Sequence, residues 1–318
     1  MALTLSASLS HASTIYTIGD LGPATRVTAL NNRGQAAGWF TDSSLTDHPL
    51  SSAASYSGQS HGLNDRGQVA GFSGSAQAAI WSGGALTLIG GPDSYALSIN
   101  NNSQIAGAAS GEAVRWSGGS VESLGVSGAA YSINSQGNLA GTGEIAPGVF
   151  RAFYWSPQSG IEWLPTLGGL SSYGLALNNS GQIAGNSTAA NGYLHAFLHT
   201  GPNSRDLWLG SATGLNNRGE VVGASENGAL LYSNGIVVDL NLLLGPESGW
   251  YLEEAAAIND QGQIAGTGIH QGERRGFLLD PTGETSPITA NPEPATLVLF
   301  LAGMALLAIG AVRRRGKQ

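Results

Sequence analysis

The sequence lacks cysteine and contains few charged residues, and each of these features excludes a class of protein. Without cysteine the chain has no disulfides, no thiolate nucleophile and no cysteine-based zinc site. Charged residues make up 11% of the chain, against about 25% in an average globular protein. The first 290 residues contain 9 Arg, no Lys and 20 acidic residues. Such a body repels phosphate backbones, so we expect no nucleic-acid partner.

The composition also contains little that favours long helices. Gly and Pro, the residues that interrupt regular structure, contribute 48 and 12 of the 318 residues. Hydrophobic residues make up 42%, which is enough for a packed core. These values argue against a coiled coil, a disordered chain or a helical bundle, and they predict an all-β fold of short strands and tight turns.

One short pattern recurs seven times within residues 13–282. The pattern starts with an aliphatic residue and Asn, followed by two variable residues. The next position is usually Gly, and it is followed by a polar residue, two small or aliphatic residues and a closing Gly. The copies start at Leu30-Asn31, Leu63-Asn64, Ile99-Asn100, Ile133-Asn134, Leu177-Asn178, Leu215-Asn216 and Ile258-Asn259. Successive Asn residues are 33, 36, 34, 44, 38 and 43 positions apart. A period near 40 is typical of propeller blades.

Each copy predicts about four short antiparallel strands. The first strand ends at the aliphatic-Asn pair, a turn follows, and later strands carry segments such as Phe153-Tyr154-Trp155 and residues 161–164. The seventh copy lacks a fourth strand, and Ile15-Tyr16-Thr17-Ile18 matches the missing one. In the first copy, residues 54–58 match a third strand and leave no room for a fourth. We therefore predict a seven-repeat β-propeller over residues 13–282, with an open array or β-sandwich as the alternative.

The two ends of the chain differ from the repeats. Residues 1–12 resemble a truncated signal peptide that lacks its basic region, so we expect the true start to lie upstream. Residues 283–291 read as a linker. Residues 295–312 contain no charge and would span about 27 Å as a helix, close to the ~30 Å hydrocarbon core of a membrane. The arginines that follow predict a cytoplasmic C-terminus and an external body.

The C-terminal residues 292–318 combine Pro-Glu-Pro, an apolar helix and an arginine cluster, in that order. The residues that define the pattern are Pro292, Glu293, Pro294, Arg313, Arg314 and Arg315. This order resembles the PEP-CTERM sorting signal of Gram-negative bacteria. The resemblance implies that an exosortase, a membrane protease, recognises the signal, and that the body is then released or anchored outside the cell. The two prolines hold the segment extended, which suits binding by a protease.

The repeats resemble the HAF repeats of bacterial extracellular proteins. The segment His195-Ala196-Phe197 matches the His-Ala-Phe triplet outright, while Arg151-Ala152-Phe153 and Arg275-Gly276-Phe277 match it in part. The resemblance implies an exported protein and brings no catalytic residue with it.

Residues capable of chemistry do not form a recognised catalytic or metal-binding pattern. His195 and His199 would lie about 13 Å apart on a strand, and neighbours such as Glu253 and Glu254 would point to opposite faces. The Asn and Asp residues of the turns offer oxygen ligands, so bound calcium is an alternative to simple turn geometry. We predict no catalytic residue, no cofactor site and no metal site.

The tryptophans fall into two groups. Trp81, Trp116 and Trp155 recur at one strand position, which indicates packing, while Trp39, Trp208 and Trp250 fall outside that register and are candidates for surface contact with glycans.

These features predict an exported, non-enzymatic protein of the cell surface or extracellular matrix. An exosortase, the membrane and an exopolysaccharide or other surface polymer are its expected partners. A glycan- or peptide-binding propeller is the first alternative, and an aromatic or acidic face on one rim would favour it. A propeller lyase or hydrolase is the second, and convergent carboxylates beside a histidine would favour that.

Overall fold

The computed structural model describes residues 10–23, 26–41, 47–49, 58–245 and 247–289. The chain divides into two compact units, one of residues 1–13 with 286–318 and one of residues 14–285. We call the second unit the body; the ends of β1 and β26 extend beyond it. Apart from one short 3₁₀ helix, all regular elements among its described residues are strands, which confirms the all-β class.

The strands are short because glycines and turn residues interrupt the chain every few residues. The first half contains β1 (Ser10–Pro23), β2 (Arg26–Leu30), β3 (Ala36–Thr41), β4 (Asp47–Pro49), β5 (Gly58–Leu63), β6 (Val69–Ser73), β7 (Gln77–Ser82), β8 (Ala85–Pro92), β9 (Ser94–Ile99), β10 (Ile105–Ala109), β11 (Glu112–Ser117) and β12 (Ser120–Ile133). The second half contains β13 (Leu139–Ala146), β14 (Val149–Ser156), β15 (Gly160–Trp163), β16 (Gly168–Leu177), β17 (Ile183–Ala189), β18 (Leu194–His199), β19 (Ser204–Leu209), β20 (Ser211–Leu215), β21 (Val221–Ser225), β22 (Gly228–Ser233), β23 (Ile236–Asp239), the 3₁₀ helix η1 (Leu240–Leu243), β24 (Trp250–Ile258), β25 (Ile264–His270) and β26 (Glu273–Thr289).

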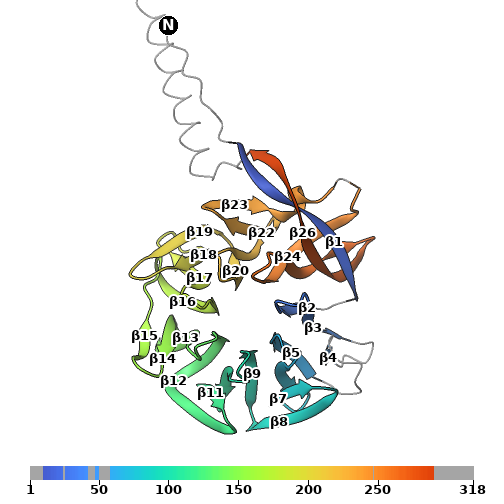
Figure 1. The fold of residues 1–318 in the computed structure, drawn as a ribbon. Helices are drawn as coiled ribbons and strands as arrows, with labels where there is room; N and C mark the ends of the chain where they lie inside the picture. Colours follow the sequence, from blue (N-terminus) through green and yellow to red (C-terminus); the bar gives the residue numbers. More distant parts are fainter. Residues whose placement is uncertain (1–9, 24–25, 42–46, 50–57, 246, 290–318) are drawn as a thin grey trace, which may run out of the picture. The chain divides into compact units, whose positions relative to one another are not determined.

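The sequence repeats form antiparallel sheets of successive strands, as predicted, and five of the seven repeats have a sheet of their own. The sheets are β2-β3-β4, β5 to β8, β16 to β19, β20 to β23 and β24-β25-β26-β1, and the long β12 joins two further repeats in one run from β9 to β15. Within the body the sheets follow one another around a common centre, and β2, β5, β9, β16, β20 and β24 lie nearest to it (Figure 1). The arrangement is propeller-like.

The N-terminal strand joins the last sheet, as the sequence predicts. β1 lies beside β26 as the outermost strand of the sheet that also holds β25 and β24. The hydroxyl of Thr282 donates to the carbonyl of Ile15 (3.1 Å), and the Arg275 guanidinium binds the Asp20 carboxylate (2.8 Å). The last sheet is therefore built from both ends of the body.

Three boundaries differ from the sequence predictions. Residues 283–289, predicted as linker, continue β26, since β1 starts at Ser10 and offers its edge to that strand. Residues 10–12, placed in the leader, belong to β1 for the same reason; residues 1–9 lie outside the described residues. The first sheet has three described strands, as expected, but its third strand is β4, residues 47–49. Of the predicted strand 54–58, Gly58 instead begins β5, and the rest is not described.

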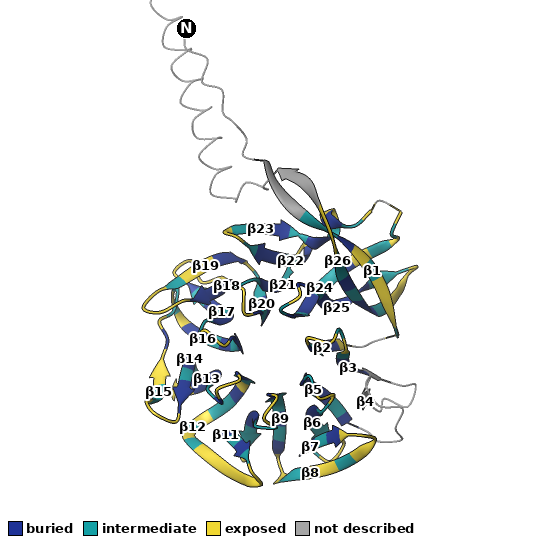
Figure 2. Ribbon diagram, viewed as in Figure 1, coloured by how far each residue is buried: buried dark blue, intermediate teal, exposed yellow. Residues whose placement is uncertain are grey.

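The core lies between neighbouring sheets. One cluster combines Ala106 and Ala113 of the third repeat with Leu139, Phe153 and Trp155 of the fourth. Small residues on one sheet make room for the large rings of the next, which allows close packing of two sheets. Exposed residues gather instead on outer strands such as β8 and β15 (Figure 2). The predicted packing role of Trp81, Trp116 and Trp155 is confirmed, since all three are buried.

Candidate functional site

The repeated Asn builds the turn after the first strand of each repeat. In Asn178, the side-chain Oδ1 accepts hydrogen bonds from the backbone N–H groups of Ser180 (3.1 Å) and Gln182 (2.9 Å). Its Nδ2 donates to Oε1 of Gln182 (2.6 Å) and to the carbonyl oxygen of Asn216 in the next repeat (3.1 Å). The buried amide thus uses both its donors and accepts twice, which only a carboxamide of this length can do here.

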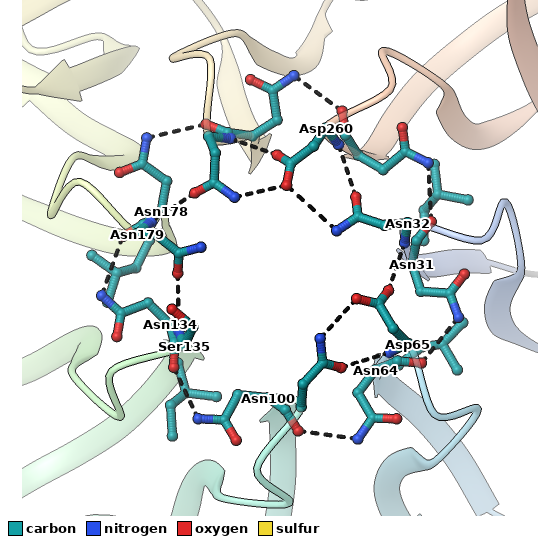
Figure 3. Close-up of a pocket in the computed structure, with 18 of the residues that line it drawn as sticks. Asn31, Asn32, Asn64, Asp65, Asn100, Asn134, Ser135, Asn178, Asn179 and Asp260 are labelled. Atoms are coloured by element: carbon teal, nitrogen blue, oxygen red, sulfur yellow. Dashed lines mark hydrogen bonds between the residues drawn. The ribbon is translucent and has the colours of Figure 1, made fainter.

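The bond to the next repeat occurs in all seven copies and returns to its starting point (Figure 3). The Nδ2 atoms donate to the next carbonyl oxygen in the order Asn31, Asn64, Asn100, Asn134, Asn178, Asn216, Asn259 and back to Asn31, at 2.9–3.2 Å. The final bond joins residues that are 228 positions apart. We call this set of bonds the asparagine circuit.

The residues after these asparagines make a second, interrupted set of contacts. At six of the seven boundaries between repeats, the backbone N–H of the residue after the Asn donates to a side-chain oxygen of the equivalent residue in the next repeat. For example, the Asn179 N–H donates to Asn217 Oδ1 (2.8 Å). The exception among the described residues is the step from Asn101 to Ser135, whose side chain is shorter. The carboxylates of Asp65 and Asp260 accept N–H donors in this way.

The asparagine-lined pocket is therefore part of the fold's own bonding. It is lined by the aliphatic residue, the Asn and the following residue of every repeat, and its volume is about 240 Å³. Its buried amides are committed to the turns and to neighbouring repeats. Among the described residues, no group of three His, Cys, Asp or Glu side chains is placed to hold a metal ion.

A second cavity lies between the inner strands, and a repeated irregularity of the backbone builds it. In every repeat the pairing of the first two strands skips one residue, three positions before the Asn. Such a β-bulge re-aims the extra side chain. The seven bulge residues are Thr28, His61, Leu97, Tyr131, Leu175, Thr213 and Ala256. All seven line this cavity of about 300 Å³, together with Arg26, Val27, Trp39 and Glu254. We call it the bulge cavity.

His61 is the most unusual side chain in the bulge cavity. Its ring lies between Trp39, with ring centroids 5.2 Å apart, and Phe72, at 5.4 Å. Its Nε2 is buried and has no hydrogen-bond partner among the described residues. Burial, with a smaller contribution from the Arg26 charge, lowers the pKa of His61 to about 4, so its imidazole is neutral at neutral pH.

Arg26 and Glu254 supply opposite charges to the same cavity. The Arg26 Nη2 lies 3.1 Å from the Glu254 Oε1, and the two residues come from the first and last repeats. Because the charges compensate each other, the cavity carries no net charge from this pair.

The residues considered in the sequence as candidates for chemistry are spread over the body. The Nδ1 of His195 lies 3.0 Å from an oxygen of Asp206, whereas His199 contacts the Ser204 hydroxyl (3.2 Å). Glu254 lines the bulge cavity, while its neighbour Glu253 pairs with Arg274 (3.3 Å). The structure therefore does not bring these residues together at one site.

The prediction of surface tryptophans is wrong for two of the three. Trp39 and Trp208 are only 9% and 8% exposed. Trp39 packs on His61, and Trp208 donates from Nε1 to the carbonyl oxygen of Ala224 in the next repeat (3.2 Å). Trp250 is half-buried and stacks on His270, with ring centroids 4.6 Å apart.

Sequence reasoning missed the bulge cavity, because its seven residues differ from one another and form no motif. A signal was present in the closing Gly of the repeat. A Cβ on Gly107 would collide with the carbonyl oxygen of Tyr95, and a Cβ on Gly185 would collide with that of Tyr173. In both repeats the tyrosine lies five positions before the Asn. The closing Gly thus marks the point where the bulged strand approaches its neighbour.

Several solved structures resemble the chain at low sequence identity. A gluconolactonase from Xanthomonas campestris is 11% identical, with 86% of this chain and 99% of that chain covered and a TM-score of 0.45. A puromycin-hydrolyzing peptidase from Mycobacterium tuberculosis is 11% identical, with coverages of 89% and 53% and a TM-score of 0.46. AofleA from Arthrobotrys oligospora is 10% identical, with coverages of 90% and 94% and a TM-score of 0.38. No curated protein matches the sequence.

The C-terminal signal is the feature that the comparisons identify. Within the described residues no helix is long and apolar enough to cross a membrane. The predicted helix 295–312 and the signal residues lie outside that part of the chain, and the resemblance to HAF repeats stays a prediction. The PEP-CTERM protein-sorting motif matches residues 292–315. The chain therefore carries a PEP-CTERM motif, which supports an exported protein processed by an exosortase.

Proposed function

We propose that the protein is an exported, non-enzymatic component of the cell surface or extracellular matrix, with a closed seven-bladed β-propeller as its body. The observation that carries this proposal is the PEP-CTERM motif at residues 292–315. In this proposal residues 295–312 hold the precursor in the inner membrane, with its C-terminus in the cytoplasm, until an exosortase acts near Pro292.

The construction of the body suits an environment outside the cell. With no cysteine, its stability rests on packing and hydrogen bonds, which do not depend on the redox state of the compartment. The asparagine circuit and the pairing of β1 with β26 both connect the first part of the body to the last. In a propeller these contacts leave only short sheet edges, which protects an exported protein against aggregation.

The use of the titratable groups supports a non-enzymatic role. His195 pairs with Asp206 and Arg275 with Asp20 across neighbouring strands of one sheet, and Arg26 pairs with Glu254 between the first and last repeats. Each pair ties two strands together, which is a sufficient structural reason for its presence.

A binding module is the second candidate, and a chain of aromatic contacts favours it. The rings of Trp39, His61, Phe72 and Tyr95 follow one another at centroid distances of 5.0–5.4 Å across the first three repeats. Trp39 and His61, at one end of this chain, line the bulge cavity, and an aromatic-lined cavity is what a glycan- or peptide-binding propeller would offer a ligand.

The first experiment compares the protein in host cells with and without exosortase activity. We expect intact mass to show loss of the segment after Pro292, and fractionation to show release from the inner membrane, only when the exosortase is active. Pro294→Ala should block both changes, whereas Pro281→Ala, outside the motif, should not. An unchanged C-terminus in the inner membrane of exosortase-positive cells would contradict the proposed processing.

A further inference from the structure

The bulge positions are chemically diverse, although their place in the repeat is constant. The Asn three residues later is the same in all seven copies, because its hydrogen bonds require a carboxamide. The bulge itself is a property of the backbone, and it occurs equally with threonine, histidine, leucine, tyrosine and alanine. The fold therefore leaves these side chains free to serve another purpose.

Two of the seven side chains are explained by contacts within the body. The Thr28 hydroxyl donates to the carbonyl of Ser60 (2.8 Å), and the Thr213 hydroxyl donates to the carbonyl of Ala255 (2.6 Å). Both bonds connect neighbouring repeats. Among the described residues no comparable bond explains His61 or Tyr131, both of which line the same cavity.

The remaining wall of the bulge cavity combines apolar and polar groups. Leu97 and Leu175 supply aliphatic surface, and Tyr131 supplies a ring that is 38% exposed. The buried Nε2 of His61 has no partner within the part of the chain that the structure describes, and an unsatisfied buried polar atom costs about 1–3 kcal/mol. A ligand in the cavity would recover that cost after a small rotation of the His61 ring that turns Nε2 toward it.

The charges of the cavity argue against an ionic ligand. Arg26 is already paired with Glu254 (3.1 Å), so neither charge is free to balance a charge on a ligand. The pair does offer donors and acceptors side by side, which suits neighbouring hydroxyl groups. The volume of about 300 Å³ is at the lower end of the range for ligand pockets, which fits a single ring and not a polymer segment.

We propose that the bulge cavity binds one neutral hexose unit, with the sugar C–H faces on Leu97, Leu175 and the Tyr131 ring. In this arrangement the hydroxyls bond to His61 Nε2, the Tyr131 hydroxyl and the Arg26–Glu254 pair. The proposal deepens the one above, since an exported protein would meet such units at the ends of surface glycans. The site itself rests on the cavity geometry.

The test measures binding of small sugars to the purified full chain in detergent by isothermal titration calorimetry. The probes are the methyl α-pyranosides of glucose, galactose and mannose, with cyclohexanol as an apolar ring and sodium glucuronate as an anionic sugar. We expect at least one neutral hexoside to bind with a stoichiometry of one, and more tightly than cyclohexanol or glucuronate.

Two variants locate the site without removing a ring from the core. His61→Phe keeps the stacking between Trp39 and Phe72 but removes the nitrogen, and Tyr131→Phe removes only a hydroxyl. Each should weaken binding about tenfold, the effect of one lost hydrogen bond. Tyr193→Phe is the matched control, because Tyr193 is exposed and lies outside the cavity.

The opposite results would overturn the proposal. These are no binding of any neutral hexoside to the folded protein, tighter binding of cyclohexanol or glucuronate, or an affinity that His61→Phe and Tyr131→Phe leave unchanged. Because binding is measured on purified protein, its failure is distinct from a failure of exosortase processing, which is read from mass and location in cells.

Discussion

At the scale of single residues, two neighbouring positions in the repeat show how a similar side chain can be essential or exchangeable. The Asn of the circuit needs both its oxygen and its nitrogen, because the amide accepts two hydrogen bonds and donates two. The next residue needs only an oxygen, since it accepts a backbone N–H from the preceding repeat. The sequence reflects this difference, with Asn seven times at the first position and Asn, Asp or Ser at the second.

A pair of substitutions separates these two roles. Asn178→Asp places oxygen against the Gln182 Oε1 and the Asn216 carbonyl, both of which are acceptors, and buries a charge. We expect a loss of about 3 kcal/mol in the free energy of unfolding, measured with urea. Asn179→Asp keeps the acceptor that Ser135 uses and should change stability by less than about 0.5 kcal/mol. Equal losses in the two variants would contradict this assignment.

His61 gives the body a specific sensitivity to acid. Its folded pKa of about 4 lies below the ordinary value of 6.5, mainly because the ring is buried. The unfolded chain therefore binds a proton first as the pH falls, and stability present above pH 6.5 is lost progressively toward pH 4.

We expect His61→Phe to lose less stability than the natural protein between pH 7 and pH 4, by up to about 3 kcal/mol. Urea unfolding of both proteins at several pH values measures the difference between their free energies of unfolding. The contributions of the carboxylates cancel in this difference, because both proteins contain them. Parallel stability curves would show that His61 is not buried as described.

At the scale of elements, the sequence was informative about strands and turns but not about their irregularities. The Asn-x-x-Gly pattern predicted the turns, and the segment 153–155 is a strand as expected. Of the predicted strand 161–164, residues 161–163 belong to β15. The strand β19 was not identified, because polar Arg205 and Asp206 interrupt its apolar pattern. The bulges were not identified either, because the skipped residue is set by pairing with the next strand and has no fixed identity.

The same limit applied to the candidate site. The asparagines were visible as a repeat, but their circuit depends on how neighbouring sheets are placed, which no local pattern records. The Arg26–Glu254 pair joins residues 228 positions apart, so neither residue indicates the other in the sequence. The pairing of Ile15 to Ile18 with the last sheet was predictable, since an unfilled fourth strand had one matching segment.

The contribution of β1 to the last sheet can be tested through Tyr16. Burial, followed by the nearby Glu220 carboxylate, raises the pKa of Tyr16 to about 12. The unfolded chain loses this proton near pH 10, so stability that is present below pH 10 is lost as the pH rises toward 12.

Tyr16→Phe should therefore lose less stability than the natural protein between pH 9 and pH 12, by up to about 3 kcal/mol. Unfolding by urea at these pH values gives the measurement. As an independent check, the amides of residues 16–18 should exchange slowly with deuterium. Exchange as fast as that of a free tail would contradict the pairing of β1 with β26.

At the scale of the whole body, the asparagine circuit has no terminal member. Asn64 bridges two repeats that are adjacent in sequence, whereas Asn259 bridges the last repeat to the first. The two are otherwise matched, since each also donates to a Gln four residues later and is followed by Asp. In an open array the terminal contacts would fray and contribute less.

We therefore expect Asn64→Ala and Asn259→Ala to destabilise the body equally, by about 2 kcal/mol each. Urea unfolding of both variants should remain a single transition with the slope of the natural protein. A clearly smaller loss for Asn259→Ala, or a second transition confined to that variant, would mean that the first and last repeats are not held together in solution.

The pairing of β1 with β26 has a consequence for the order of events during translocation. β1 opens the body and β26 ends at Thr289, directly before the sorting motif at residue 292. A chain that crosses the membrane from its N-terminus keeps β1 without its partner until the last strand has emerged. Under the proposed export route, the final sheet forms only after β26 has emerged, so we expect it to be completed at about the time when the sorting motif becomes available to the exosortase.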